Sequence, residues 1–244
     1  MPIGGPDYGI YSVRRGSSPS FDLSELAARL GALSTITRTG ETLWQSDFSE
    51  GLSGKGLSFS GAGSMALLNR ERFLSGNYSI CFVAGSSPGC TILKVYAPFE
   101  LEGSYGVELW GACPLLTGRL NLWFREYVDS THSRLFEVSM DFDAPYLKVY
   151  DGALGWVLLS DDPALVPSIY PWYQYKLVVN HDTGHYVRLS WQGTEYDLSD
   201  YIYVAGGGID EGCSYIEIEV IGPLEGLTAF YLDRLILTVN EPVF

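Results

Sequence analysis

The clearest pattern in the sequence is an alternation of apolar and polar residues between Tyr170 and Leu198. The apolar positions are Tyr173, Tyr175, Leu177 and Val179 in the first run, and Val187, Leu189 and Trp191 in the second. A period of two places each set on one face of a β-strand. One face of this segment is therefore expected to be apolar and the other to be wet.

Two turn sequences separate these runs. His181-Asp182-Thr183-Gly184 ends in a glycine that tolerates positive φ, and Gln192-Gly193 is a two-residue loop of the hairpin kind. The segment therefore predicts a three-stranded antiparallel meander. Its apolar face needs a second sheet to cover it, which the rest of the chain must supply.

Short runs of the same kind, separated by Gly, Pro, Asn and Asp, fill the chain after residue 40. Further strands are expected at Leu43–Phe48, Ser64–Leu68, Tyr78–Val83, Thr91–Phe99, Gly106–Gly111, Leu120–Val128, Ser133–Phe142, Tyr146–Tyr150, Trp156–Leu159, Tyr215–Ile221 and Ala229–Val239. This spacing predicts an all-β fold, a two-sheet antiparallel β-sandwich of the jelly-roll kind. Ala229–Val239 is apolar on both faces, which indicates a central strand. Gly206-Gly207-Gly208 is expected to be a flexible loop.

Residues 1–40 differ from the rest and are expected to form an extended arm with one short helix at about 21–31. Asp22 and Glu25 have the spacing of a capping box, and Gly31 suits the residue after a helix. Such a short helix must pack on something to be stable. The residues expected to dock onto a partner are Arg14, Arg15, Phe21, Leu23, Leu26 and Leu30. Residues 41–244 are expected to form the sandwich.

The net charge of −14 limits the classes of partner. An acidic surface repels phosphate groups, which argues against nucleic acid and against anionic membranes. The sequence shows neither a signal peptide nor an apolar run long enough to span a bilayer, so synthesis in the cytoplasm of the host is expected. The small numbers of Lys, Asn and Gln hint at a thermophilic host.

The four cysteines are Cys81, Cys90, Cys113 and Cys213. No pair has the spacing of a zinc knuckle, and buried free thiols are the expected state. Cys81 and Cys90 flank a turn sequence, which leaves a bridge across a hairpin as the alternative.

Four segments resemble the concanavalin A-like and laminin G-like jelly-roll superfamily: Trp44–Leu52, Gly76–Ser79, Tyr175–Asn180 and Phe230–Asp233. In that superfamily an early strand carries D-F-x-x-G-L, and the last strand, which pairs near the first, carries a pattern similar to Tyr231–Leu235. The resemblance implies the sandwich fold. It leaves function open, because the superfamily includes lectins, glycosidases, adhesins and virion parts.

Residues 22–33 and 37–52 also resemble the beginning of uncharacterised proteins of tailed phages and prophages. This second resemblance implies a virion protein, with the N-terminal arm docked onto its neighbours.

The glycosidases of the superfamily carry three acids on one strand, and the nearest match here is Glu217-Ile218-Glu219, which lacks the third acid. We therefore expect these two glutamates to lie on a wet sheet face and the protein not to be an enzyme. Asp141 and Asp143 are expected to serve a turn. His181 and His185 flank a turn and are weak candidates for a metal site.

Calcium is the more plausible ion, because lectin-like members of the superfamily often bind it through loop acids. The acids available in loops are Asp161, Asp162, Asp197, Asp200, Asp210 and Glu211. No spacing among them selects a site, so no cofactor is predicted.

Sugar binding requires an exposed aromatic platform with polar groups beside it. The candidates are Tyr170, Trp172, Tyr201 and Tyr203, and more widely Tyr173, Trp110 and Trp123; a core or subunit-interface role is the alternative for each.

The favoured hypothesis is a non-enzymatic virion protein, a capsid decoration or tail-associated subunit. It would bind virion proteins such as the major capsid protein and form an oligomer, with a trimer as the candidate state. The alternative is a carbohydrate-binding module or adhesin, and a glycoside hydrolase is the third hypothesis.

Overall fold

The computed structural model describes residues 40–52, 55–74, 78–86, 89–96, 102–115, 117–162, 172–207 and 213–243. Gly40–Phe244 forms one compact unit. The predicted arm and helix, with all six predicted docking residues, lie outside the described residues. No helix in the described part of the chain is long and apolar enough to cross a bilayer.

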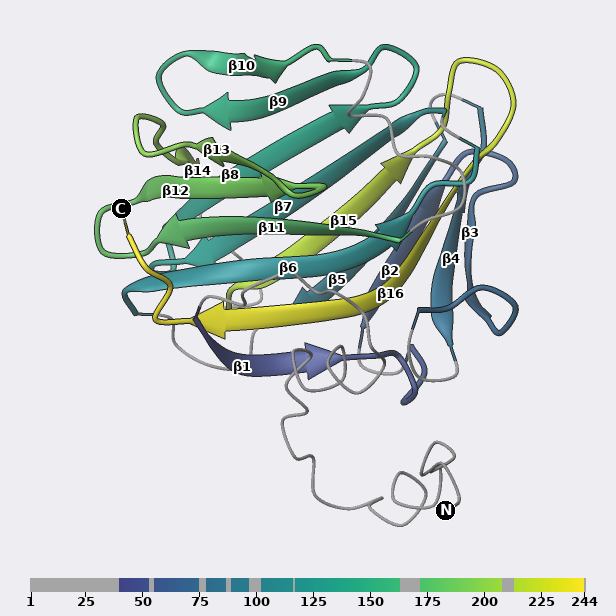
Figure 1. Ribbon diagram of the computed structural model, residues 1–244, viewed down its shortest axis with the longest axis horizontal. Helices are drawn as coiled ribbons and strands as arrows, with labels where there is room; N and C mark the ends of the chain where they lie inside the picture. The colour runs from purple at the N-terminus through teal and green to yellow at the C-terminus, as the bar shows by residue number, and fades with distance from the viewer. Residues whose placement is uncertain are drawn as a thin grey trace, which may run out of the picture. The chain divides into compact units, whose positions relative to one another are not determined.

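The described residues form two antiparallel sheets, which confirms the predicted β-sandwich (Figure 1). Sheet A has the order β13-β12-β11-β6-β16-β4-β3, with β1 also paired to β16. Its strands are β1 (Glu41–Ser46), β3 (Met65–Asn69), β4 (Ser79–Ala84), β6 (Ser104–Ala112), β11 (Tyr173–Asn180), β12 (His185–Trp191), β13 (Thr194–Asp197) and β16 (Thr228–Val239).

Sheet B has the order β10-β9-β8-β7-β15-β5-β2, with β14 also paired to β8. Its strands are β2 (Gly56–Ser60), β5 (Cys90–Tyr96), β7 (Arg119–Tyr127), β8 (His132–Asp141), β9 (Tyr146–Asp151), β10 (Gly155–Ser160), β14 (Val204–Gly207) and β15 (Tyr215–Ile221). In Figure 1 sheet A lies in front of sheet B.

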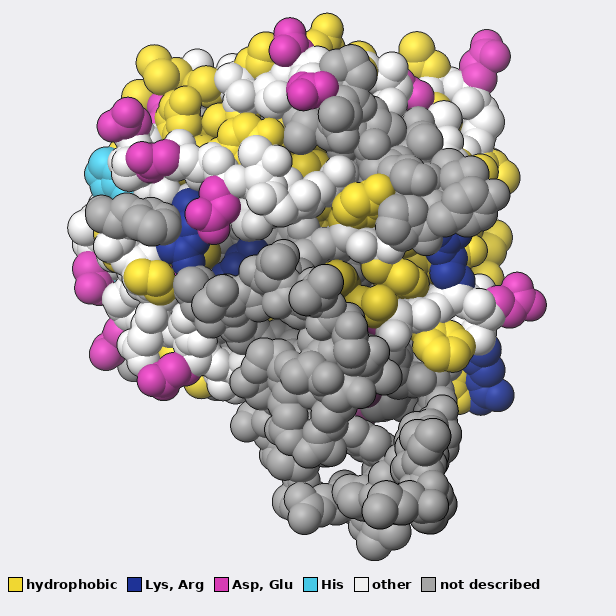
Figure 2. Space-filling model, in the orientation of Figure 1, with side chains coloured by type: hydrophobic (Ala, Val, Ile, Leu, Met, Phe, Trp, Pro, Cys, Tyr) yellow, Lys and Arg dark blue, Asp and Glu magenta, His cyan; other side chains and the backbone are white. Residues whose placement is uncertain are grey.

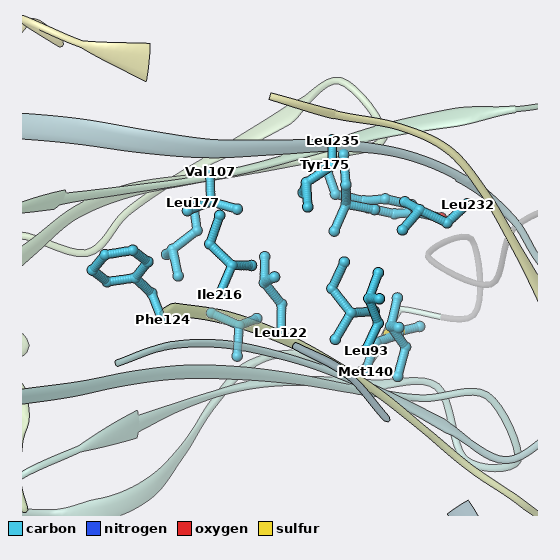
Figure 3. Packing of buried hydrophobic residues seen from close by; sticks show 14 of the residues in the cluster. Leu93, Val107, Leu122, Phe124, Met140, Tyr175, Leu177, Ile216, Leu232 and Leu235 are labelled. Atoms are coloured by element: carbon cyan, nitrogen blue, oxygen red, sulfur yellow. The ribbon is translucent and has the colours of Figure 1, made fainter. Parts of the chain in front are cut away.

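The core fills the space between the two sheets. Figure 3 shows Val107, Leu177 and Leu235 of sheet A facing Leu122 and Ile216 of sheet B, and all five are at most 3% exposed. These are the apolar members of the period-two runs. Because they point inward, their polar neighbours in sequence point away from the core, and this alternation creates the outer faces discussed below.

The predicted meander is confirmed as β11, β12 and β13. Gly184 ends the first turn with φ of 70°, and Gln192 and Gly193 form the second with φ of 52° and 86°. Two successive residues with positive φ are the signature of a type I′ turn, which matches the twist of a hairpin.

The predicted central strand is also confirmed. β16 pairs with β6 along one side and with β4 and then β1 along the other, so the last strand pairs with the first as the resemblance implied. Its core-facing Leu235 and its outward-facing Ile236 are both fully buried. Burial on both faces explains why the sequence of β16 does not alternate.

Two strands were not predicted. β2 is an edge strand of five residues in which only Leu57 and Phe59 alternate with polar neighbours, and so short a run is a weak signal for a strand. β14 corrects the prediction of a flexible loop, because Gly206 and Gly207 pair with Ser133 and His132 of β8. A Cβ on Gly206 would lie 2.5 Å from the Ser133 hydroxyl, so a larger residue here would displace the Ser133 side chain.

All four cysteines are free thiols, and Cys81 and Cys113 are buried as expected. Cys81 lies in β4 of sheet A and Cys90 in β5 of sheet B. The turn between them is therefore a crossover between sheets, and the alternative of a bridged hairpin is wrong.

Candidate functional site

The outer face of sheet B carries a continuous row of aromatic and charged residues. Phe124 of β7 and Ile216 of β15 face the core, so the residues next to them in each strand face outward. Cross-strand pairing then aligns one outward residue from each of six successive strands. In order from β10 to β5, this row contains Trp156, Tyr150, Glu137, Trp123, Glu217 and Lys94.

A second row lies beside the first, two residues further along each strand. It contains Lys148, Ser139, Asn121 and Glu219, from β9, β8, β7 and β15. We call the ten residues of the two rows the sheet B face. Neighbouring strands are about 4.8 Å apart, so six strands span roughly 24 Å from end to end.

The aromatic members are spread along the first row. Trp156 is 44% exposed, and its ring meets the ring of Tyr150 edge-on at 4.9 Å between centroids. Trp123, two strands beyond Tyr150, is half-buried. Half-buried aromatic rings with polar neighbours have the composition of a sugar-binding platform.

The polar members hold one another in place. The Ser139 hydroxyl donates to Asn121 Oδ1 at 2.7 Å, and Asn121 Nδ2 donates to Glu219 Oε2 at 2.8 Å. On the neighbouring row Lys94 Nζ lies 3.8 Å from Glu217 Oε2. The carboxylates of Glu217 and Glu219 are therefore stabilised by donors.

Glu137 lies near the middle of the first row and is only 7% exposed. Burial, and then the negative charge of Glu219, raise the pKa of its carboxyl to about 7. Glu217 adds to this pKa shift, whereas the nearby indole of Trp123 and the positive charge of Arg119 oppose it. Glu137 is thus a carboxyl group that exists in both protonation states near neutral pH.

The backbone beneath Glu137 is fixed from the core side. The hydroxyl of the fully buried Tyr186 accepts from the Glu137 N–H at 2.8 Å and donates to the Tyr150 carbonyl at 2.7 Å. β8 pairs with β14 up to Leu135, and from Glu137 onward it pairs with β9 instead. We call this change of partner the fork in sheet B. Tyr186 of sheet A therefore bridges the fork in sheet B and sets the position of Glu137.

The outer face of sheet A differs, because it carries a cluster of buried ion pairs. Glu241 lies 2.6 Å from Lys176 Nζ and 2.6 Å from the Arg188 guanidinium. All three residues are at most 6% exposed. On this side of the molecule Asp and Glu side chains are spread around the outline (Figure 2). Charged groups that are buried and bound to one another contribute to the fold and are poorly accessible to a ligand.

The predicted aromatic candidates do not form one platform. Trp172 immediately precedes β11, whereas Tyr203 bonds to Gly184 beyond the opposite end of that strand, so they lie roughly 25 Å apart. Tyr201 and Tyr203 are half-buried and pack against the core. Tyr170 lies outside the described residues. Of the wider set, Trp123 is in the sheet B face and Trp110 is in β6 of sheet A.

The two turn histidines point to different partners. His181 Nδ1 bonds to the buried Glu126, whereas His185 Nδ1 lies 3.1 Å from the Ser199 carbonyl oxygen. Within the described residues, no group of three or more His, Cys, Asp and Glu side chains is arranged to hold a metal ion. Of the predicted calcium candidates, Asp210 and Glu211 lie outside those residues. Asp141 serves a turn as predicted, accepting from the N–H groups of Asp143 and Ala144.

The prediction for Glu217 and Glu219 was right about their face and incomplete about their surroundings. Both point outward, but Glu217 is only 7% exposed, and Glu137 shares the face from two strands away. The alternation of Glu137 with Phe136 and Val138 shows that it points outward. Its approach to Glu219 depends on cross-strand register, which the sequence does not reveal.

No protein-family model matches the sequence, and no curated protein matches it. The fold is similar to several solved structures. An endo-β-1,4-glucuronan lyase of the fungus Trichoderma reesei gives a TM-score of 0.55 at 8% identity, covering 81% of this chain and 95% of that chain. A conserved carbohydrate esterase of the Shiga toxin-encoding bacteriophage phi24B gives 0.54 at 13% identity, covering 83% and 100%.

A sialidase gives a TM-score of 0.54 at 10% identity, but the match covers 83% of this chain and only 19% of the sialidase. At such identities these likenesses show the fold alone. They agree with the jelly-roll sandwich and with the implied concanavalin A-like fold, and they do not link the chain to phages.

Proposed function

We propose that the protein binds a carbohydrate on the sheet B face and performs no reaction on it. The observation that carries this proposal is the row that runs across six strands, in which three aromatic residues and three charged residues lie side by side. A sugar ring presents apolar C–H faces and polar edges, so it needs aromatic surface and polar groups side by side.

The length of the row favours a chain of several sugars over a single sugar. Trp156 and Tyr150 form one aromatic pair, and Trp123 lies about 10 Å from Tyr150, with Glu137 between them. The names of two similarly folded proteins, a carbohydrate esterase and a glucuronan lyase, agree with a carbohydrate ligand. Those likenesses themselves concern only the fold.

A glycan array followed by affinity measurements on the best ligand tests the proposal. Trp123→Ala is expected to weaken binding at least tenfold, about 1.4 kcal/mol, because it removes the aromatic surface in the middle of the row. Trp110→Ala is the matched control, since Trp110 is also half-buried on an outer sheet face, that of sheet A. We expect this control to bind like the wild type.

A blank array, or equal losses in the two variants, would contradict the proposal. The non-enzymatic part needs its own measurement, because a protonated and an ionised carboxyl group on one face are also what a glycosidase uses. Incubation of the bound glycan with the protein should release no reducing ends, and their accumulation would show hydrolysis.

The predicted virion role, with a major capsid protein as partner and a trimer as the oligomeric state, stays a prediction. The residues that were to dock onto a partner lie outside the described part of the chain. A sugar-binding sheet face is compatible with a free-standing module and with an adhesin on a larger particle.

A further inference from the structure

We propose that Glu137 meets the carbohydrate as a neutral carboxylic acid and donates a hydrogen bond to one of its acceptor oxygens, so that binding weakens as pH rises. This inference rests on the proposed function and assigns a donor, and a pH dependence, to the same site.

The position of Glu137 is the first support. It stands between two aromatic residues of the row, Tyr150 in β9 and Trp123 in β7, each directly paired with it across the strands. A sugar stacked on either ring would therefore lie against the Glu137 carboxyl. The hydrogen bonds from Tyr186 fix the backbone at this point, so the carboxyl is held in place before a ligand arrives.

The hydrogen bonds already made beside Glu137 are the second support. One N–H of the Asn121 amide donates to Glu219 Oε2, and Lys94 Nζ lies 3.8 Å from Glu217 Oε2, so these two donors are turned toward acids of β15. Ring and glycosidic oxygens of a sugar can only accept hydrogen bonds. A neutral Glu137 carboxyl supplies an O–H donor at the centre of the row, whereas an ionised carboxylate can only accept.

The charges around Glu137 favour the neutral form. Glu217 and Glu219 of β15 repel its negative charge, and Arg119 of β7 opposes them. Lys148 of β9 lies one pair further along the ladder, opposite Ser139, and Lys94 of β5 is next to Glu217. Burial works in the same direction as the two acids, and together they bring the pKa of Glu137 to about 7. A ligand that covers the carboxyl would favour the neutral form further.

The expected pH dependence follows from the fraction of protein in which Glu137 is protonated. When only that fraction binds, the apparent affinity is the intrinsic affinity multiplied by the fraction. With a pKa of about 7 the fraction is about 0.9 at pH 6 and about 0.01 at pH 9, so affinity should fall by one to two orders of magnitude between these pH values.

The test is calorimetric titration of the wild type and two variants with the best glycan from the array, at pH 6, 7.5 and 9. The amide of Glu137→Gln donates at every pH, so this variant should bind with nearly constant affinity and exceed the wild type at pH 9. Glu195→Gln, which changes an exposed acid of β13 in sheet A, is the matched control and should keep the wild-type profile.

A second readout does not depend on comparing affinities. At pH 8 the wild type should take up close to one proton on binding, measured from heats in buffers of different ionisation enthalpy, and Glu137→Gln should take up none. A wild type that binds the glycan equally at all three pH values would overturn this inference and leave the proposed function standing. A Glu137→Gln variant whose affinity for the glycan falls with rising pH as much as that of the wild type would have the same two consequences. Absence of binding at every pH would overturn both.

Discussion

At the scale of single residues, Glu137 shows how environment gives an ordinary side chain unusual properties. Nothing in the local sequence distinguishes it from Glu217 or Glu219, which also alternate with apolar residues. Its raised pKa comes from burial and from two acids on β15, which is far away in sequence. The alternation predicted which way these three side chains point, but the electrostatic coupling among them required the strand register.

The same pKa shift predicts how stability depends on pH. The Glu137 pKa is about 7 in the folded protein against 4.5 in the unfolded chain, so the folded state binds more protons between these values. The contribution of Glu137 to the free energy of unfolding is therefore largest below pH 4.5. It falls by about 3 kcal/mol in total as pH rises through 7.

Glu137→Gln removes that proton equilibrium. Denaturant unfolding at pH 5 and pH 8 should show the wild type losing stability relative to the variant, by up to about 3 kcal/mol. Unfolding free energies of the two proteins that change in parallel with pH would show that Glu137 has a normal pKa in the folded state.

At the scale of elements, strands that contribute to the core were predictable and edges were not. β11, β12, β15 and β16 have strong patterns because one or both faces are buried. β2 and β14 are short strands, each paired to one neighbour. β2 has only two alternating apolar residues, Leu57 and Phe59, and β14 has no apolar period. The candidate site was missed for a related reason, since its residues come from six strands and only register unites them.

The fork where β8 leaves β14 for β9 gives a prediction at this scale. Tyr186→Phe removes the hydroxyl that accepts from the buried Glu137 N–H and donates to the half-buried Tyr150 carbonyl. The cost should be about 1–3 kcal/mol in unfolding free energy. Tyr146→Phe, at an exposed position of β9, is the control and should change stability by less than about 0.5 kcal/mol.

Stability of Tyr186→Phe equal to that of the control would show that the hydroxyl does not hold the fork. The same variant should also weaken glycan binding, because the backbone that carries Glu137 and Tyr150 would be less firmly placed.

At the scale of the whole molecule, the two sheets have different outer faces on a shared core. Sheet A carries buried ion pairs around Glu241, and sheet B carries two rows that combine aromatic rings with acids. Composition predicted an acidic β-sandwich rich in tyrosine, but it did not distinguish the two faces. On sheet B, register brings residues from β10 to β5 into one line, whereas on sheet A Glu241, which follows β16, meets Lys176 of β11 and Arg188 of β12.

The most direct test of the central claim is to map a bound oligosaccharide by changes in backbone amide NMR signals across the whole chain. The account predicts that the largest changes fall on β7, β8, β9 and β15, around Trp123, Glu137 and Tyr150. Changes confined to sheet A, or to residues 1–39, would contradict the assignment of the sheet B face as the carbohydrate site.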